Sequence, residues 1–223
     1  MEYYPVFLRL TGRACLVIGG GTVATQKVRS LLEARAAVTV IAPVLSPDLT
    51  ALATAGTIVT QARPFAAGDT RGFSLVYAAT ADAAVNRAVF EEAEAAGVLV
   101  NVVDRPSQCR FIAPAVVRRG PLTVAISTGG TSPAMASRVR RELETAFGAE
   151  YAVTLQLLGR LRTTLQTRTL PAGERQRILR SLADSSLLDL VRDGDAAAID
   201  RLLTDTVGVP CSLAGLGVDL GSA

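Results

Sequence analysis

A run of three glycines between an apolar segment and a helix-like segment is the first place where this chain could do chemistry. The stretch GGGTVA fits the pattern G-x-G-x-x-A, with Gly19, Gly21 and Ala24 at the fixed positions. The first glycine permits a sharp turn, the second lets a pyrophosphate approach the backbone, and the small third residue lets helix and strand pack closely. The pattern predicts a dinucleotide site at residues 19–24. The alternative is a tight strand-to-helix turn that binds nothing.

The segment expected to contact the ribose lacks the usual acid. In dinucleotide-binding folds a carboxylate about 20 residues after the glycines binds the ribose hydroxyls. Here residues 41–44 are uncharged, and the first acid is Asp48. Residues 41–48 also contain no arginine suited to a 2′-phosphate. This pattern favours NAD over NADP.

Proton transfer has to proceed without histidine, because the sequence contains none. The remaining candidates are a carboxylate, a tyrosine, the single lysine (Lys27) and solvent. Asp104 directly follows the apolar run VLVNVV at residues 98–103, and ligands of open parallel sheets bind beyond the carboxyl ends of the strands. Asp104 is therefore a candidate proton acceptor, although it could instead cap the Asp-Arg-Pro turn.

A second loop with binding groups is STGGTSP, residues 127–133. It combines hydroxyls with two glycines whose backbone N–H groups stand beside a helix N-terminus. Such a concavity suits a carboxylate or a phosphate. The alternative is a well-capped helix start preceded by a flexible segment.

A parallel sheet would bring the first-half candidates to one edge. Apolar runs alternate with helix-like segments through that half of the chain, which is typical of a sheet covered on both faces. The expected strands are residues 14–18, 38–42, 57–61, 74–79 and 98–103, and the expected helices are residues 22–36, 47–55 and 82–96. The predicted fold class is α/β, with an N-terminal Rossmann parallel sheet.

After Asp104 the pattern changes. Two strand-like segments flank an RRGP turn, a helix begins at Ser132-Pro133, and residues 150–205 read as helical. The last segment is small and glycine-rich and is expected to be a flexible tail. The predicted parts are residues 1–113, a central α+β segment 114–147, a small helical domain 148–211 and the tail 212–223.

The composition excludes several classes of protein. A net charge of +3 is too small to indicate a nucleic-acid partner, and no apolar run is long enough for a membrane span. The start lacks a secretory signal, and three scattered cysteines favour a reducing cytoplasm over a disulfide or zinc framework. Cys109 is expected to pack rather than to act as a nucleophile, because no histidine can activate it. Of the 23 basic residues all but Lys27 are arginines, which fits either a high-GC gene or an acidic small-molecule ligand.

Four segments occur in order between residues 3 and 145: GGGTVATQK, LLEARAAVTVIAP, VYAATADAAVN and NVVDRPSQCRFIAPAVVRRGPLTVAISTGGTSP. Together they resemble the precorrin-2 dehydrogenase family, which includes the N-terminal half of bacterial siroheme synthase. The resemblance implies NAD-dependent oxidation of precorrin-2 to sirohydrochlorin, and a homodimer in which residues 114–147 are the dimerisation segment. Some relatives also insert ferrous iron, so a bifunctional enzyme stays open. A non-catalytic NAD-sensing module is a remote alternative.

The resemblance also implies roles for individual residues. Asp104 takes the place of the family's proton-handling aspartate. The implied NAD contacts are Gly19, Gly20, Gly21, Thr22, Val23, Ala24, Ile41, Ala42, Pro43, Ala79, Thr80, Asn101 and Val102. The tetrapyrrole substrate is rich in carboxylates, and its implied contacts are Arg105, Ser127, Thr128, Gly129, Gly130 and Thr131. No residue is assigned to a metal.

Overall fold

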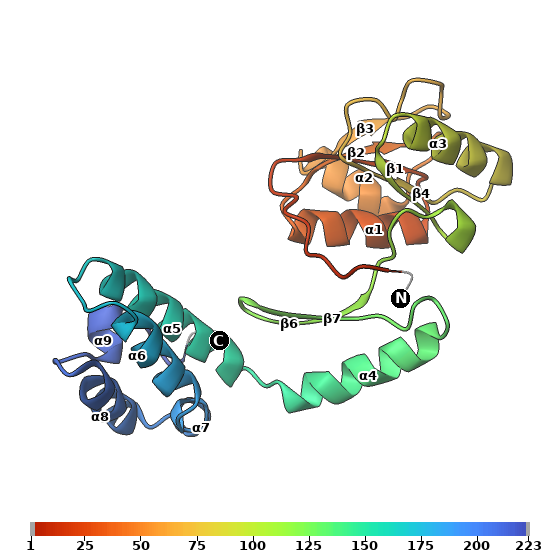
Figure 1. Cartoon of the computed structure of the whole chain (residues 1–223). Coiled ribbons are helices and arrows are strands. Elements are labelled where there is room, and N and C mark those ends of the chain that lie inside the picture. The colour runs from red at the N-terminus through yellow and green to blue at the C-terminus, as the bar shows by residue number, and fades with distance from the viewer. Residues whose placement is uncertain (1–2, 222–223) are drawn as a thin grey trace. The chain divides into compact units, whose positions relative to one another are not determined.

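The computed structural model describes residues 3–221 and divides into two compact units (Figure 1). Unit 1 is Met1–Ala113 and unit 2 is Pro114–Ala223. Unit 1 carries a five-stranded sheet with helices, whereas unit 2 consists of a two-stranded hairpin followed by helices.

The sheet of unit 1 is entirely parallel, with the strand order β3-β2-β1-β4-β5. The strands are β1 (Ala14–Ile18), β2 (Ala37–Ile41), β3 (Val59–Gln61), β4 (Leu75–Ala78) and β5 (Leu99–Val102). Near-continuous apolar runs form β1, β4 and β5 because both faces of the sheet are covered. The predicted Rossmann sheet is confirmed, although its third strand begins at Val59 rather than at residue 57.

Helices cover both faces of this sheet. They are α1 (Thr22–Glu33), α2 (Pro47–Thr54) and α3 (Ala83–Ala95). Side chains of β1 alternate between the faces: Cys15 and Val17 belong to the core that includes α1 and α2, whereas Leu16 and Ile18 pack with α3. Since all five strands are parallel, their carboxyl ends lie along one edge, where the loops after β1, β2, β4 and β5 hold the predicted residues of this unit.

The helix expected over residues 22–36 ends earlier, at Glu33. Arg35 has a φ of 57°, its N–H donates to Leu32 O at 2.8 Å, and Ala36 N–H donates to Leu31 O at 3.0 Å. These two bonds form a Schellman motif, which satisfies the last carbonyls of the helix and turns the chain into β2. Arginine occupies the position where glycine is usual, so no local signal predicted the end of the helix there.

Unit 2 begins with an antiparallel hairpin and continues with helices. Its elements are β6 (Ala115–Arg119), β7 (Leu122–Ile126), α4 (Pro133–Ala146), α5 (Glu150–Gln166), α6 (Glu174–Ala183), α7 (Leu187–Asp193), α8 (Ala196–Val207) and α9 (Leu213–Leu216). Leu157, Leu161 and Leu165 lie on one face of α5 and are almost completely buried. They anchor a core of their own, to which α6, α7, α8 and α9 contribute.

The end of the described chain differs from the expected flexible tail. Ser212 caps α9 by accepting from Gly215 N–H at 3.1 Å, and Asp200 accepts from Leu213 N–H at 2.7 Å. Leu213, Leu216 and Val218 are buried in the helical core. The glycine-rich composition suggested a tail, but these apolar side chains share one buried face and order the segment. Residues 222–223 lie outside the described residues.

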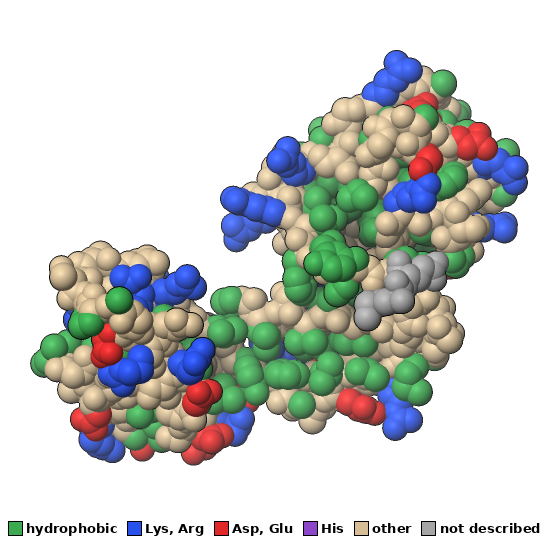
Figure 2. Space-filling view, viewed as in Figure 1, with side chains coloured by type: hydrophobic (Ala, Val, Ile, Leu, Met, Phe, Trp, Pro, Cys, Tyr) green, Lys and Arg blue, Asp and Glu red, His purple; other side chains and the backbone are tan. Residues whose placement is uncertain are grey.

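The surface of the helical part of unit 2 carries charges of both signs. On the face drawn in Figure 2, Lys and Arg side chains are interspersed with Asp and Glu side chains over these helices. Among residues 3–221, no helix is both long and apolar enough to cross a membrane.

Candidate functional site

The three glycines after β1 differ in what surrounds them. Gly19 has a φ of 126°, and a Cβ there would lie 2.3 Å from Ala79 O. A Cβ on Gly20 would lie 2.0 Å from Val44 O, but a Cβ on Gly21 would meet no atom within 4 Å. The first two glycines are therefore required by the chain's own packing. The space over Gly21 is open, as expected where a ligand approaches the backbone.

The N-terminus of α1 lacks a side-chain cap. Its N-cap is Gly21, and no side chain accepts a hydrogen bond from the first turn. In contrast, Ser46 caps α2 and Asp82 caps α3. The first N–H groups of α1 therefore have no side-chain acceptor, and the sequence pattern predicts that a pyrophosphate binds there. Thr22 and Val23, in this first turn, are exposed, whereas Ala24 is buried against the sheet.

A hydroxyl pair behind the glycine loop was not recognised from the sequence. Thr25 Oγ1 donates to Gly21 O at 3.0 Å and lies 2.9 Å from Ser46 Oγ. Ser46 N–H donates to Gly20 O at 2.8 Å. These bonds tie the loop after β2 to the glycine loop and fix its shape. No local pattern pairs these two hydroxyls, because the residues lie 21 positions apart in the sequence.

The end of β2 is uncharged, as expected. Ile41 and Ala42 are buried and Pro43 is exposed. Ala42 N–H donates to Gln61 O at 3.2 Å, so the residues that follow β3 run beside this end. Arg63 comes two residues after β3, the strand that pairs with β2. An arginine therefore follows the neighbouring strand, although residues 41–48 contain none.

The turn after β4 is held by its own side chains. Ala79 N–H donates to Ile18 O at 2.8 Å, which brings this turn beside the glycine loop. Thr80 Oγ1 lies 2.8 Å from Asn86 Oδ1, and Asn86 Nδ2 donates to Thr80 O at 3.0 Å. The backbone of Ala79 and Thr80 is therefore a rigid rim of the candidate cofactor site.

Asn101 and Val102, the predicted cofactor contacts at the end of β5, have side chains that are engaged within the protein. Asn101 is 9% exposed and its Nδ2 donates to Phe111 O at 2.9 Å. Val102 is 1% exposed, so its side chain is part of the core. Any contact of these two residues with a cofactor would be made mainly by the backbone.

Asp104 follows β5 in an unusual conformation. Its φ is 58°, in the left-handed region, and its side chain is exposed. Arg105, the next residue, is also exposed and precedes the short 3-10 helix η1 (Pro106–Gln108). Cys109 Sγ lies 3.2 Å from both Val102 O and Arg105 O, so its thiol can donate to either of these carbonyls of the turn that contains Asp104. The strained turn is thereby held with its carboxylate facing solvent.

Two other proton carriers are poorly placed. Tyr77 is 6% exposed, and burial raises the pKa of its hydroxyl to about 12. Lys27 Nζ lies 5.4 Å from the centre of the Tyr77 ring, a cation–π contact on the α1 side of the sheet. Burial also raises the pKa of the Cys109 thiol, which supports a packing role over a nucleophilic one. Asp104 remains the candidate proton acceptor, because it follows a strand directly and its carboxylate is exposed.

The STGGTSP loop in unit 2 is largely bonded to itself. Thr128 Oγ1 lies 3.1 Å from both the N and the O of Ser132, and Ser127 Oγ accepts from Gly129 N–H at 3.0 Å. Ser132 caps α4 by accepting from Met135 N–H at 3.2 Å. Gly129, Gly130 and Thr131 are exposed. The loop is thus a capped helix start, and its role toward a ligand stays a prediction.

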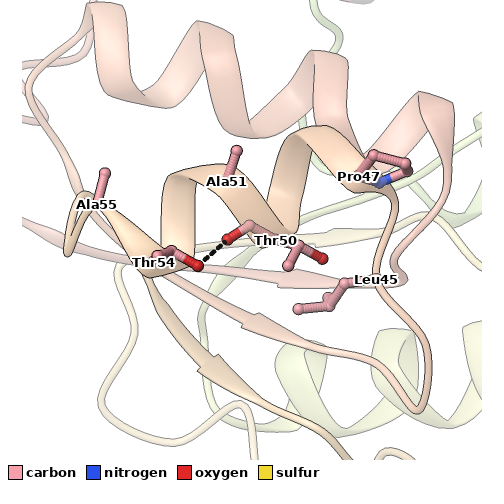
Figure 3. A pocket seen from close by; sticks show the side chains of 6 residues that line it. All are labelled: Leu45, Pro47, Thr50, Ala51, Thr54 and Ala55. Atoms are coloured by element: carbon pink, nitrogen blue, oxygen red, sulfur yellow. Dashed lines mark hydrogen bonds between the residues drawn. The ribbon is translucent and has the colours of Figure 1, made fainter.

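Figure 3 shows a hollow beside α2, which Leu45, Pro47, Thr50, Ala51, Thr54 and Ala55 line. Its two hydroxyls are engaged within the helix: Thr50 Oγ1 donates to Ser46 O and Thr54 Oγ1 to Thr50 O, both at 3.0 Å. The hollow therefore offers little to orient a dinucleotide. In the part of the chain that the structure describes, no three His, Cys, Asp or Glu side chains form a group that could hold a metal ion.

Comparison with known proteins finds two family models that match the chain. Residues 6–115 match a family of NAD(P)-binding domains, and residues 119–146 match the central domain of sirohaem biosynthesis proteins. The siroheme synthase of Chromobacterium violaceum is 40% identical over 198 residues, which are 89% of this chain and 42% of that protein. The siroheme synthase of Nitrosococcus oceani is 44% identical over 168 residues, or 75% of this chain and 36% of that protein.

A solved structure adds the architecture. SirC, precorrin-2 dehydrogenase, matches with a TM-score of 0.78 and 28% identity, covering 92% of this chain and 100% of that chain. The chain belongs to the siroheme synthase and precorrin-2 dehydrogenase family. The NAD(P)-binding family match and this membership support a nicotinamide cofactor, NAD or NADP. The chain spans about two fifths of the length of the curated siroheme synthases it matches.

Proposed function

We propose that the chain oxidises precorrin-2 to sirohydrochlorin with NAD as the hydride acceptor. The observation that carries this proposal is the pairing of an open, uncapped glycine loop after β1 with an exposed carboxylate, Asp104, after β5. In the sheet, β1 and β5 are separated by β4 alone, so their ends lie roughly 10 Å apart. A dinucleotide whose pyrophosphate rests on α1 can extend its nicotinamide end toward Asp104.

The chemistry requires two acceptors. Oxidation of the substrate removes a hydride and a proton, and NAD, when bound, takes the hydride. The Asp104 carboxylate would accept the proton and pass it to solvent, for which its exposed position is suited. The rigid turns at Ala79 and Thr80 would hold the cofactor in place, and the exposed Arg105 of the same unit would bind a carboxylate of the substrate.

Three finer statements belong to the same proposal. NAD is preferred to NADP because residues 41–44, at and directly after the end of β2, carry no charge that would bind a 2′-phosphate. The protein is a cytoplasmic homodimer, and residues 114–147 form its interface. Half-exposed apolar side chains on β7 and the exposed Met135 of α4 support that assignment.

An anaerobic assay tests the function. The purified chain is mixed with precorrin-2 and NAD, and the absorbances of NADH and sirohydrochlorin are followed together. Equal amounts of both products are expected. If NAD binds but neither product forms, the dehydrogenase is excluded and a cofactor-sensing module is left.

A second activity, insertion of ferrous iron into sirohydrochlorin, is favoured by the exposed Asp104 carboxylate, which could also take protons from the macrocycle. Ferrous or cobaltous ion is added after the first stage, with a protein-free control. Faster loss of sirohydrochlorin than in the control would show a bifunctional enzyme, and an equal rate a dehydrogenase alone.

A further inference from the structure

An arginine lies beside the ribose end of the predicted cofactor site. β2 and β3 pair in register, with Ile41 opposite Gln61, and Arg63 follows two residues later. In Rossmann folds the end of the second strand is where an acid binds the ribose 2′-hydroxyl or an arginine binds a 2′-phosphate. Because residues 41–44 carry no charge, Arg63 is the cation at the carboxyl ends of this strand pair.

The guanidinium of Arg63 is already occupied. Nη1 donates to Asp69 Oδ2 at 2.7 Å and to Pro64 O at 3.0 Å. Nη2 donates to Asp69 Oδ1 at 2.7 Å and to Gln61 Oε1. A guanidinium has five N–H groups, two of them on each terminal nitrogen, so these four bonds leave only Nε–H. The planar fork that would bind a phosphate in two places is filled by the protein itself.

The carboxylate of Asp69, which clamps Arg63 through two hydrogen bonds, is itself held in place. The Asp69 side chain is only 13% exposed, and its carboxylate also accepts from Ala66 N–H at 2.8 Å. The hydrogen bond from Arg63 lowers the pKa of Asp69, so the carboxylate is charged at neutral pH. The side chain of Arg63 is 39% exposed, so a ligand could reach it if Asp69 released it.

We propose that Asp69 makes the site selective for NAD, by occupying the guanidinium of Arg63 that would otherwise bind the 2′-phosphate of NADP. This inference rests on the proposed use of NAD at the glycine loop. It assigns the discrimination to a residue one strand away from the position where a ribose-binding acid is usually sought.

The test measures the dissociation constants of NAD and NADP for the full chain by isothermal titration calorimetry. Asp69→Ala is expected to lower the dissociation constant of NADP roughly tenfold, because a free arginine gains charge-assisted bonds to the phosphate. The NAD value is expected to stay within about twofold. In the double variant Asp69→Ala/Arg63→Gln the gain for NADP should disappear. Glu174→Ala is the matched control, because it removes the acid from another ion pair with two hydrogen bonds, to Arg177 in unit 2.

Each outcome has one meaning. An unchanged NADP constant in Asp69→Ala, a gain that persists without Arg63, or a wild-type chain that binds NADP as tightly as NAD would each overturn the inference. If the wild type binds NAD and oxidises precorrin-2 in those cases, the proposed function stands while the inference fails. A wild type that binds neither cofactor overturns both.

A second variant, Gln61→Ala, tests the inference if Asp69→Ala does not fold. If Asp69→Ala no longer binds NAD, Gln61→Ala releases one Nη2 hydrogen and leaves Asp69 in place. It should strengthen NADP binding by a smaller factor than tenfold, on the order of twofold. An unchanged NADP constant in this variant would count against the clamp.

Discussion

At the scale of the residue, Asp104 is a position where chemistry and folding can be separated. Its φ of 58° belongs to the left-handed region, which most side chains avoid. Asparagine adopts this conformation about as readily as aspartate. A change to asparagine therefore removes the charge and keeps the backbone turn.

Asp104→Asn is expected to bind NAD as the wild type does and to lose roughly 10²- to 10⁴-fold in kcat, the range for removal of a general base. Anaerobic assays with precorrin-2 and NAD, quenched at fixed times, measure kcat. Calorimetry measures the dissociation constant of NAD. Asp48→Asn, an exposed acid on α2, is the control for the loss of one charge. Wild-type turnover in Asp104→Asn would remove this carboxylate from the mechanism.

Substitutions at Gly21 and Gly19 test cofactor binding and folding separately. Gly21→Ala should fold like the wild type, because its Cβ meets no atom of the chain, and should weaken NAD binding. Gly19→Ala should instead lower the melting temperature, because its Cβ would collide with Ala79 O. Thermal unfolding and NAD titration of both variants check this. Normal NAD affinity in Gly21→Ala would mean that the pyrophosphate lies elsewhere.

At the scale of the element, the segment between β3 and β4 is held by one carboxylate of α3. Glu92 accepts from Gly68 N–H at 2.6 Å, from Thr70 N–H at 2.8 Å and from the hydroxyl of Thr70, a residue with no exposed surface. Burial alone would raise the pKa of Glu92, but the bonds from Thr70 and Gly68 outweigh it and the pKa is lowered. Ionised Glu92 therefore stabilises the fold above the ordinary carboxyl pKa, and this contribution is lost as the pH falls through the lowered value.

Glu92→Ala should reduce the free energy of unfolding by about 1–3 kcal/mol at pH 7, because it leaves the buried Thr70 hydroxyl without its acceptor. The difference from the wild type should shrink below about pH 4, where the wild-type carboxylate is protonated. Urea unfolding followed by circular dichroism at both pH values measures it. Glu91→Ala, an exposed neighbour on α3, should change little.

The elements could be predicted where one local pattern dominates. The apolar runs of β1, β4 and β5 and the Ser-Pro start of α4 are local signals, and the structure has these elements near the expected bounds. The clamp of Arg63 by Asp69 and the bond of Thr25 to Ser46 join residues through folded loops, for which no local pattern exists. The burial of α9 was missed although its apolar spacing was present, because glycine content was given more weight.

At the scale of the whole molecule, the two units have separate hydrophobic cores. In unit 1 the core lies on the two faces of the parallel sheet, and in unit 2 it lies among α5 to α9. The predicted cofactor contacts all fall in unit 1. A ligand that binds only the folded state of one unit stabilises that unit in the first place.

NAD at about 100 times its dissociation constant should stabilise unit 1 by roughly 2.7 kcal/mol. Hydrogen–deuterium exchange with mass spectrometry should show slower exchange in β1, α1 and the turns after β2 and β4. Peptides from α5 to α8 should exchange at the same rate with and without NAD. Protection confined to unit 2 would contradict the assignment of the cofactor site.

The position of Lys27 within α1 has a practical consequence. Lys27 is the single lysine of the chain and lies within α1, one turn beyond the glycine loop. A protease specific for lysine can therefore cut the polypeptide at one bond only, and it can do so only when α1 opens. The rate of that one cleavage reports how often α1 opens at the start of the predicted cofactor site. A gel that separates the intact chain from its two fragments measures this rate.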